Sequence, residues 1–157
     1  MITVRLVEAA DVPAVVEHVA GVLAEFGLEF GVGSETDAAV RALPASYADH
    51  GGAFWVAYDH QDGRSTLLGT CGVFPVAPRT YELRKMYLAA AARGRGVGTR
   101  LLDEAVAWTK AHGGERMVLD TTEAMTAAIA FYERHGFVRD DDQIRGSRCT
   151  RGYARPL

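Results

Sequence analysis

The sequence predicts one α/β domain, in which about four helices flank a mixed, mostly antiparallel sheet of about six to seven strands. The chain has 157 residues, 48% of them hydrophobic, which suits a single domain with a substantial core. Three consecutive strand patterns are joined only by short turns, so these strands must be antiparallel. A later strand–helix–strand succession predicts a parallel pair joined by a right-handed crossover. We expect residues 1–157 to form one domain.

The first third of the chain begins with a strand and continues with helices. The stretch "ITVRLVE" (Ile2–Glu8) alternates apolar and polar residues with period two. Asp11 is placed to cap a helix, whose apolar residues recur at helical spacing until Gly27 ends it. Residues 34–48 hold a second helical segment, which Pro44 breaks because proline lacks the N–H that a helix interior needs.

The middle of the chain carries three strand patterns and a long helix. Strands are predicted over residues 53–60 and 66–76, on either side of the turn "QDGRS", and over residues 81–88. A glycine-rich loop follows, and then an amphipathic helix runs from Val97 to Gly113.

The last third contains a short strand, a helix and a terminal strand. Residues 116–122 ("RMVLDTT") are predicted to form the strand, and residues 124–136 the helix. Gly136 ends that helix, with Phe137 placed for the hydrophobic contact of a Schellman-type stop. The tail from residue 147 to residue 157 has the pattern of a last strand.

Composition narrows the function classes. The net charge of −3 disfavours general nucleic-acid binding, which normally requires a basic excess. The two cysteines, Cys71 and Cys149, have no spacing typical of a metal site, so we expect reduced thiols and no metal. No apolar run resembles a signal peptide or a membrane span, so we expect a cytoplasmic protein without a membrane partner.

The stretch "AARGRGVGTRLL" places glycines and arginines at the start of a helix. Glycine at Gly94, Gly96 and Gly98 allows positive φ angles and close approach of the backbone to a ligand. The first N–H groups of a helix have no internal partner, and the helix dipole makes this end positive. Arg93 and Arg95 add fixed charge. The loop therefore predicts an anion site, most simply for phosphate.

Two familiar phosphate-binding patterns do not fit this loop. A dinucleotide fingerprint would need a third glycine where Thr99 or Leu101 stands, and a P-loop would need Gly-Lys-Ser/Thr. A simpler alternative stays open, in which the glycines serve only the geometry of an arginine-rich turn.

The pattern Arg93-x-x-Gly96-x-Gly98 resembles the pyrophosphate-binding loop of the GNAT superfamily of N-acetyltransferases. On either side, "ELRKMYL" is similar to the fourth strand of that family and "AIAFYERHGF" to its last helix and following turn. The three segments lie between Glu82 and Phe137 in matching order. The resemblance implies a GNAT-like acyl-CoA N-acyltransferase fold, acetyl-CoA as the acyl donor and a small-molecule or peptide amine as the acceptor.

The resemblance also implies which residues hold acetyl-CoA. The pyrophosphate would lie on the backbone of the loop, and the pantetheine arm would run beside the fourth strand, where that strand separates from the fifth. The late helix would contact the arm. These cofactor-binding positions are Arg93, Gly94, Arg95, Gly96, Val97, Gly98 and Thr99 in the loop, Met86, Tyr87 and Leu88 in the strand, and Met125 and Ala128 near the helix start.

Glu82 is the residue that we expect to act as general base. The alternation of the strand predicts that it shares a face with Arg84, Met86 and Leu88, and the GNAT family often has a glutamate here. A water molecule could stand between its carboxylate and the amine. A structural carboxylate paired with Arg84 is the alternative.

Tyr132 is the residue that we expect to act as general acid toward the CoA thiolate, because the family's tyrosine in this helix points at the sulfur. An ordinary core tyrosine is the alternative. One position departs from the family: Met125 stands where many members have an asparagine that contacts the arm. Thr122 or Thr126 would have to supply the missing hydrogen bonds.

Four questions stay open at the level of sequence. Arg145, Arg148 and Arg151 could bind a carboxylate of the acceptor or could simply be solvated. A non-catalytic acyl-CoA-binding sensor would share the loop without needing Glu82 or Tyr132. The identity of the amine has no readable code, and a homodimer is suggested only by analogy.

Overall fold

The computed structural model describes residues 1–157, which form a seven-stranded sheet in the order β1-β2-β3-β4-β5-β7-β6. Only β4 and β5 pair in parallel, and every other neighbouring pair is antiparallel. The predicted mixed, mostly antiparallel sheet is therefore confirmed. The strands are β1 (Ile2–Leu6), β2 (Ala53–Gln61), β3 (Arg64–Ala77), β4 (Thr80–Leu88), β5 (Arg116–Thr121), β6 (Val138–Arg139) and β7 (Arg151–Pro156).

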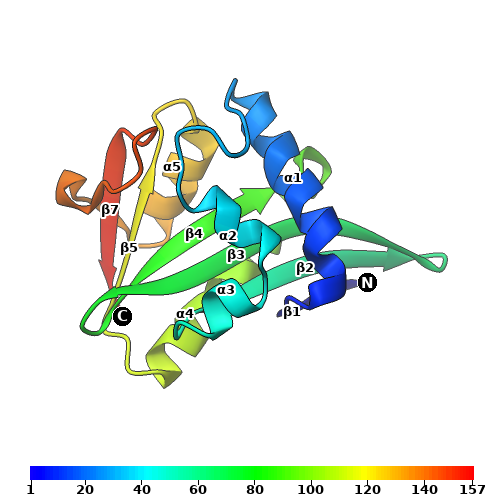
Figure 1. Cartoon of the computed structure of the whole chain (residues 1–157), viewed down its shortest axis with the longest axis horizontal. Coiled ribbons are helices and arrows are strands. Elements are labelled where there is room, and N and C mark those ends of the chain that lie inside the picture. The colour runs from blue at the N-terminus through cyan, green and yellow to red at the C-terminus, as the bar shows by residue number, and fades with distance from the viewer.

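Helices cover both faces of the sheet. They are α1 (Val12–Glu25), α2 (Asp37–Arg41), α3 (Ala45–Ala48), α4 (Val97–Ala111) and α5 (Thr126–Arg134). In Figure 1, α1, α2 and α3 lie in front of the sheet, and α4 lies behind it. Side chains of α5 join those of α4 in one core cluster, so the two helices share a face. The sheet is thus the middle layer of three.

Several boundaries differ from the sequence-based prediction. The helical segment predicted over residues 34–48 is two short helices on either side of Pro44, which raises the number of α-helices from about four to five. Asp11 does occupy the N-cap position of α1, but its carboxylate makes no cap hydrogen bond there. It accepts instead from Arg5 and from the hydroxyl of Tyr58. The last strand begins at Arg151 rather than at residue 147.

Two hydrophobic clusters hold the layers together. The larger one lies between the sheet and α4 and α5, and includes Trp55, Leu101 and Ile129. The smaller one lies between the sheet and α1, α2 and α3, and includes Val15 and Tyr47. Burial of apolar surface on both faces stabilises the three-layer arrangement and holds the strands that carry the site.

A β-bulge interrupts β4. Gly72 on β3 is opposite Arg84, whereas Thr70, two residues earlier, is opposite Tyr87, so β4 contains one extra residue. Lys85 lies at this bulge with φ +52°. Its carbonyl accepts a hydrogen bond of 2.8 Å from Thr70 Oγ1, which satisfies a buried backbone group.

The bulge changes which side chains share a face. Glu82 and Arg84 do share one, as expected. Met86 packs in the larger cluster, and Leu88 packs against it. Tyr87 packs against the smaller cluster. The prediction that Met86 and Leu88 lie on the face of Glu82 is therefore wrong, because the extra residue reverses the alternation beyond Arg84.

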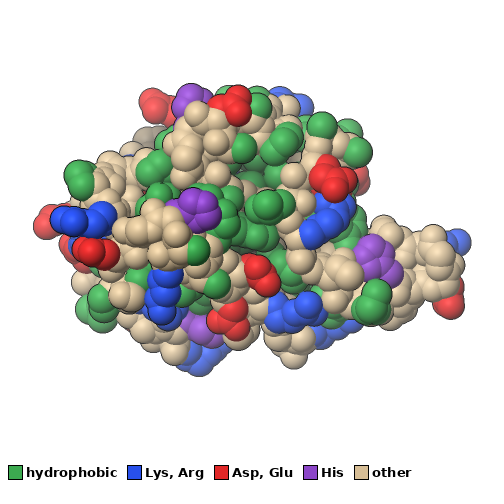
Figure 2. Space-filling model, turned by 90° about the horizontal axis from the view of Figure 1, so that it is seen from below, with side chains coloured by type: hydrophobic (Ala, Val, Ile, Leu, Met, Phe, Trp, Pro, Cys, Tyr) green, Lys and Arg blue, Asp and Glu red, His purple; other side chains and the backbone are tan.

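The β2–β3 hairpin projects from the body of the molecule, as Figure 2 shows on the right of the view from below. Hydrophobic side chains gather in the middle of this face, and charged side chains surround them. No helix of the structure is both long enough and apolar enough to cross a bilayer.

Candidate active site

The parallel strands β4 and β5 separate after a short paired segment. They pair only from Thr80 opposite Arg116 to Glu82 opposite Val118, and beyond this β4 continues to Leu88 without β5. Figure 1 shows the two strands fanning apart. The predicted separation of these strands is confirmed, and it leaves backbone groups of β4 without a neighbouring strand on that side.

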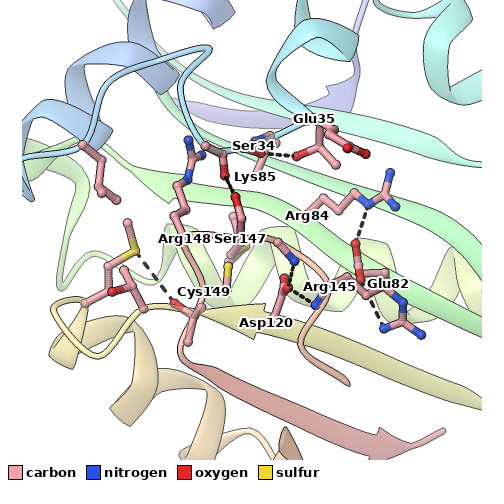
Figure 3. Close-up of a pocket in the computed structure, with 18 of the residues that line it drawn as sticks. Ser34, Glu35, Glu82, Arg84, Lys85, Asp120, Arg145, Ser147, Arg148 and Cys149 are labelled. Carbon is pink, nitrogen blue, oxygen red and sulfur yellow. Dashed lines mark hydrogen bonds and ion pairs between the residues drawn. The ribbon is translucent and has the colours of Figure 1, made fainter. Parts of the chain in front are cut away.

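A cavity of about 720 Å³ lies where the strands separate. Its walls come from five segments: β4, the end of β5, the start of α5, the loop after α1 and the loop before β7. The lining includes many polar, charged and sulfur-containing side chains: Glu82, Arg84, Lys85, Met86, Tyr87, Asp120, Thr122, Met125, Tyr132, Arg145, Arg148 and Cys149. Figure 3 shows ten labelled members of the lining, with charged side chains prominent among them.

The glycine-rich loop presents free backbone donors beside the start of α4. Gly94 and Gly96 both have φ +77°, a conformation that favours glycine, and open space lies where a Cβ would be. The N–H groups of Gly94, Gly96, Val97, Gly98 and Thr99 donate no hydrogen bond within the chain. Five unpartnered donors at the N-terminus of a 15-residue helix form a surface that suits an anion.

Gly98 differs from the other two glycines of the loop. It lies inside α4, and a Cβ there would come within 3.2 Å of Leu88 and 3.3 Å of Phe131. The expectation of a positive φ angle is therefore wrong for Gly98, although its free N–H still belongs to the donors of the loop. Its missing side chain lets α4 pack closely against β4 and α5.

The two arginines of the loop already have acidic partners. Arg93 lies 2.8 Å from Glu25 on α1 and also donates to the carbonyl of Leu88. Arg95 lies 3.1 Å from Asp59 on β2. Both pairs are partly exposed. Arg93 and Arg95 therefore add positive charge near the anion site, but the carboxylates of Glu25 and Asp59 partly neutralise it.

The positions expected to hold the pantetheine arm surround the same gap. Met86 and Tyr87 line the cavity, whereas Leu88 lies just beyond it. The Tyr87 carbonyl accepts a hydrogen bond of 2.9 Å from His18 Nε2, so that backbone group has a partner within the chain. Burial lowers the pKa of His18, which keeps the imidazole neutral with its proton on Nε2.

The start of α5 also faces the gap. Met125 is buried and lines the cavity, and its sulfur lies 3.9 Å from Thr121 Oγ1. Of the two threonines considered as substitutes for the family's asparagine, Thr122 lines the cavity, whereas Thr126 is exposed outside it. Ala128 packs against both core clusters and does not line the cavity.

Glu82 is buried at the cavity between two guanidinium groups, as Figure 3 shows. Its Oε1 accepts from Arg84 Nε at 2.6 Å, and its Oε2 lies 3.4 Å from Arg145 Nη1. The ion pair between Glu82 and Arg84 that was considered as the alternative is therefore present in the structure. It does not replace the first interpretation, because the paired carboxylate still lines the cavity.

Tyr132 is buried and lines the cavity from α5. Its hydroxyl makes no hydrogen bond within the chain, and the one fully enclosed polar side-chain atom without a partner is the hydroxyl of Tyr47. The Tyr132 hydroxyl is thus open to the cavity. Burial raises the pKa of Tyr132, so its hydroxyl remains protonated throughout the physiological pH range.

An ionic cluster that sequence reasoning missed supports one wall of the cavity. The buried carboxylate of Asp37 accepts from Lys85 Nζ, from both terminal nitrogens of Arg148 at 3.0 and 3.1 Å, and from the N–H of Gly31 at 2.7 Å. Arg148 also donates to the carbonyl of Val32. The Asp37 cluster (Asp37, Lys85 and Arg148) therefore joins the start of α2, and the loop between α1 and α2, to the bulge of β4 and the loop before β7. The feature of the sequence that could have indicated this cluster is Lys85, a charged residue inside a strand that is otherwise predicted to be buried.

A second carboxylate organises the loop before β7. Asp120 Oδ2 accepts from the N–H groups of Arg145 and Gly146, both at 2.7 Å. Burial and the nearby charge of Asp120 raise the pKa of Cys149 to about 12, so this thiol stays neutral. Both cysteines are free, as expected.

The three tail arginines do not behave alike. Arg145 and Arg148 line the cavity, and Arg148 is held by Asp37. Arg151 lies outside it, where it contacts Glu123 and the hydroxyl of Tyr153. No group of three or more His, Cys, Asp or Glu side chains is arranged to hold a metal ion.

Known proteins share this fold. A structure of an acetyltransferase of the GNAT family from Staphylococcus aureus Mu50 has a TM-score of 0.90 and 21% identity, and the match covers 100% of this chain and 99% of that one. The PaiA N-acetyltransferase from Thermoplasma acidophilum, solved in complex with coenzyme A, has a TM-score of 0.77 and 21% identity, with 100% and 99% covered.

Sequence comparison is more specific than the likeness of fold. The uncharacterized N-acetyltransferase YjgM of Escherichia coli K12 is 31% identical over 141 residues, which is 87% of this chain and 82% of that protein. Relatives with such names favour an enzyme over a non-catalytic sensor. The model of the acetyltransferase (GNAT) family matches residues 21–137, which is well over half of the chain. The chain therefore belongs to the GNAT family and is an acetyltransferase whose acyl donor is acetyl-CoA.

Proposed function

We propose that this protein transfers the acetyl group of acetyl-CoA to a primary amine by direct attack, with Glu82 as general base and Tyr132 as general acid. The observation that carries the proposal is the cavity between β4 and β5, which both side chains line from different elements. The free N–H groups of the loop before α4 would hold the pyrophosphate, and the unpaired part of β4 would hold the arm.

The chemistry needs a base because the amine is charged at neutral pH. An amine with a pKa near 10.4 is neutral in fewer than about one molecule in 1,000 at pH 7, which costs about 4–5 kcal/mol. Glu82, directly or through water, would take one proton from the ammonium group, and the neutral nitrogen would then bond to the thioester carbonyl carbon. As the C–S bond breaks, the thiolate would receive a proton from Tyr132, and the second proton that the nitrogen must lose would return to the Tyr132 oxygen.

A screen of primary amines with acetyl-CoA tests the proposed function, with free CoA thiol as the readout. Thiol release that depends on the amine supports acetyl transfer. Binding of acetyl-CoA without release across the whole panel would contradict it, and would favour the sensor instead.

Gly96→Glu should weaken binding of coenzyme A by about 100-fold, because it places a negative charge among the free N–H groups that would hold the pyrophosphate. Gly113→Glu is the matched control. Gly113 also has a positive φ and open space, but lies at the other end of α4. Both variants carry a similar backbone cost of about 1 kcal/mol. Calorimetry with coenzyme A should separate them, and equal affinities would remove the loop from the site.

Glu82→Gln should lower kcat at pH 7 by about 100-fold or more, because the glutamine cannot accept the proton of the amine. The deficit should shrink as the pH rises toward the pKa of the amine, since solvent then supplies the neutral nucleophile. Glu115→Gln, at an exposed ion pair with Arg79, is the control. A pH–rate profile of the Glu82 variant parallel to that of the unmodified enzyme would contradict the role of base.

A further inference from the structure

Two arginines share the carboxylate of Glu82, and each keeps guanidinium donors that make no hydrogen bond within the chain. Arg84 donates from Nε alone, and its two terminal nitrogens make no hydrogen bond within the chain. Arg145 contacts Glu82 and Gln143 through Nη1 alone, which leaves Nε and Nη2 free. Both side chains line the cavity. Guanidinium donors without a hydrogen-bond partner in the chain therefore belong to the lining of the cavity that the acceptor would enter.

The position of Arg84 is well constrained. Its guanidinium carbon lies 4.4 Å from the centroid of the Phe74 ring, and its side chain is only 17% exposed. Stacking on an aromatic ring and the ion pair with Glu82 together hold the plane of the group. The free edge of Arg84 is thus preorganised for a planar anion, which a guanidinium can bind through two parallel hydrogen bonds.

The other two cations of the cavity, Lys85 and Arg148, are already neutralised by a carboxylate. Lys85 and Arg148 both pair with Asp37, whose carboxylate also accepts from a backbone N–H. Asp120 is occupied by backbone N–H groups, and the exposed Glu35 makes no ion pair with Arg84 or Arg145. Arg84 and Arg145 thus share the single carboxylate of Glu82, and their remaining N–H groups are the guanidinium donors of the cavity that no other side chain occupies.

We propose that the acceptor is an amine that carries a carboxylate on the adjacent carbon, as a free α-amino acid does. The free N–H groups of Arg84 and Arg145 would bind the carboxylate, and Glu82 would accept from the amino group. In an α-amino acid the nitrogen and the carboxylate oxygens are about 3 Å apart, so both ends can reach neighbouring groups of this cluster. The inference rests on the proposed function and adds the class of substrate to it.

Matched pairs of acceptors test this inference: the common L-amino acids, and the same amino acids with the carboxylate replaced by a carboxamide. The amide should have a kcat/KM about 10- to 100-fold lower, because the guanidinium contacts are lost. The amino group of an amide is less basic, so its neutral fraction is larger and would favour the opposite result.

Arg145→Gln provides the second arm. We expect it to raise KM for the acid by about 10- to 100-fold, and to change KM for the amide less than about threefold. Arg64→Gln, on the distant β2–β3 hairpin, should change neither. Equal turnover of acids and amides, or an equal effect of Arg145→Gln on both, would overturn the inference while acetyl transfer stands. Absence of thiol release with every amine would overturn the proposed function and this inference with it.

Discussion

Tyr132→Phe should lower kcat by about 10²- to 10⁴-fold and leave the affinity for acetyl-CoA almost unchanged. The variant removes one oxygen atom, which makes no hydrogen bond within the chain and is open to the cavity. The fold therefore loses little, whereas the departing thiolate loses its proton donor. Single-turnover measurements of thiol release, beside calorimetry with acetyl-CoA, separate the chemical step from binding.

The raised pKa of Tyr132 is compatible with this role. Burial disfavours the phenolate, but a thiolate that forms at the same buried position is made more basic by the same effect. Tyr81→Phe is the matched control, because Tyr81 lies on β4 outside the cavity and packs against Trp108. A Tyr132 variant that turns over as fast as the Tyr81 variant would remove Tyr132 from the reaction.

Asp37→Ala should destabilise the protein by about 3–5 kcal/mol, which corresponds to a fall in Tm of roughly 10 °C. Asp37 is fully buried, and its removal leaves Lys85 and Arg148 as uncompensated charges. Lys85→Met should cost much less, because Asp37 then keeps Arg148 and the N–H of Gly31. Thermal and urea unfolding of the two variants measure this asymmetry.

The control for Asp37 is an aspartate without a partner. Asp103→Ala, on the exposed face of α4, should change stability by less than about 0.5 kcal/mol. If Asp37→Ala lowered the free energy of unfolding no more than Asp103→Ala does, the Asp37 cluster would not be what joins the two loops to β4.

Acid should weaken the Asp37 cluster. Burial alone would raise the pKa of Asp37, but hydrogen bonds from Arg148, Lys85 and Gly31 outweigh burial and lower it. A carboxyl whose pKa is lowered in the folded state contributes stability above its unfolded pKa of about 3.9. That contribution disappears as the pH falls through the folded pKa, so the variant and the unmodified protein should converge in stability at strongly acidic pH.

Local signals were sufficient for the order of elements. The alternation in β1, the long amphipathic pattern of α4 and the glycine stops are properties of neighbouring residues, and the structure reproduces them. The side-chain and register details that differ are those that contacts with other segments decide. Asp11 binds Arg5 and Tyr58 rather than the backbone of α1, and the extra residue of β4 is visible only when β3 is placed opposite it.

The sequence by itself determined the three-layer α/β fold, and it predicted an anion-binding loop at Gly94, Gly96 and Gly98 and the roles of base and acid for Glu82 and Tyr132. These follow from periodicity, from backbone freedom at glycine and from the family pattern. Only the tertiary structure decided how charges are shared: that Glu82 lies between Arg84 and Arg145, and that Asp37 neutralises Lys85 and Arg148. The reason is physical, since ion pairing and burial depend on distances between segments far apart in the chain, which no local pattern encodes.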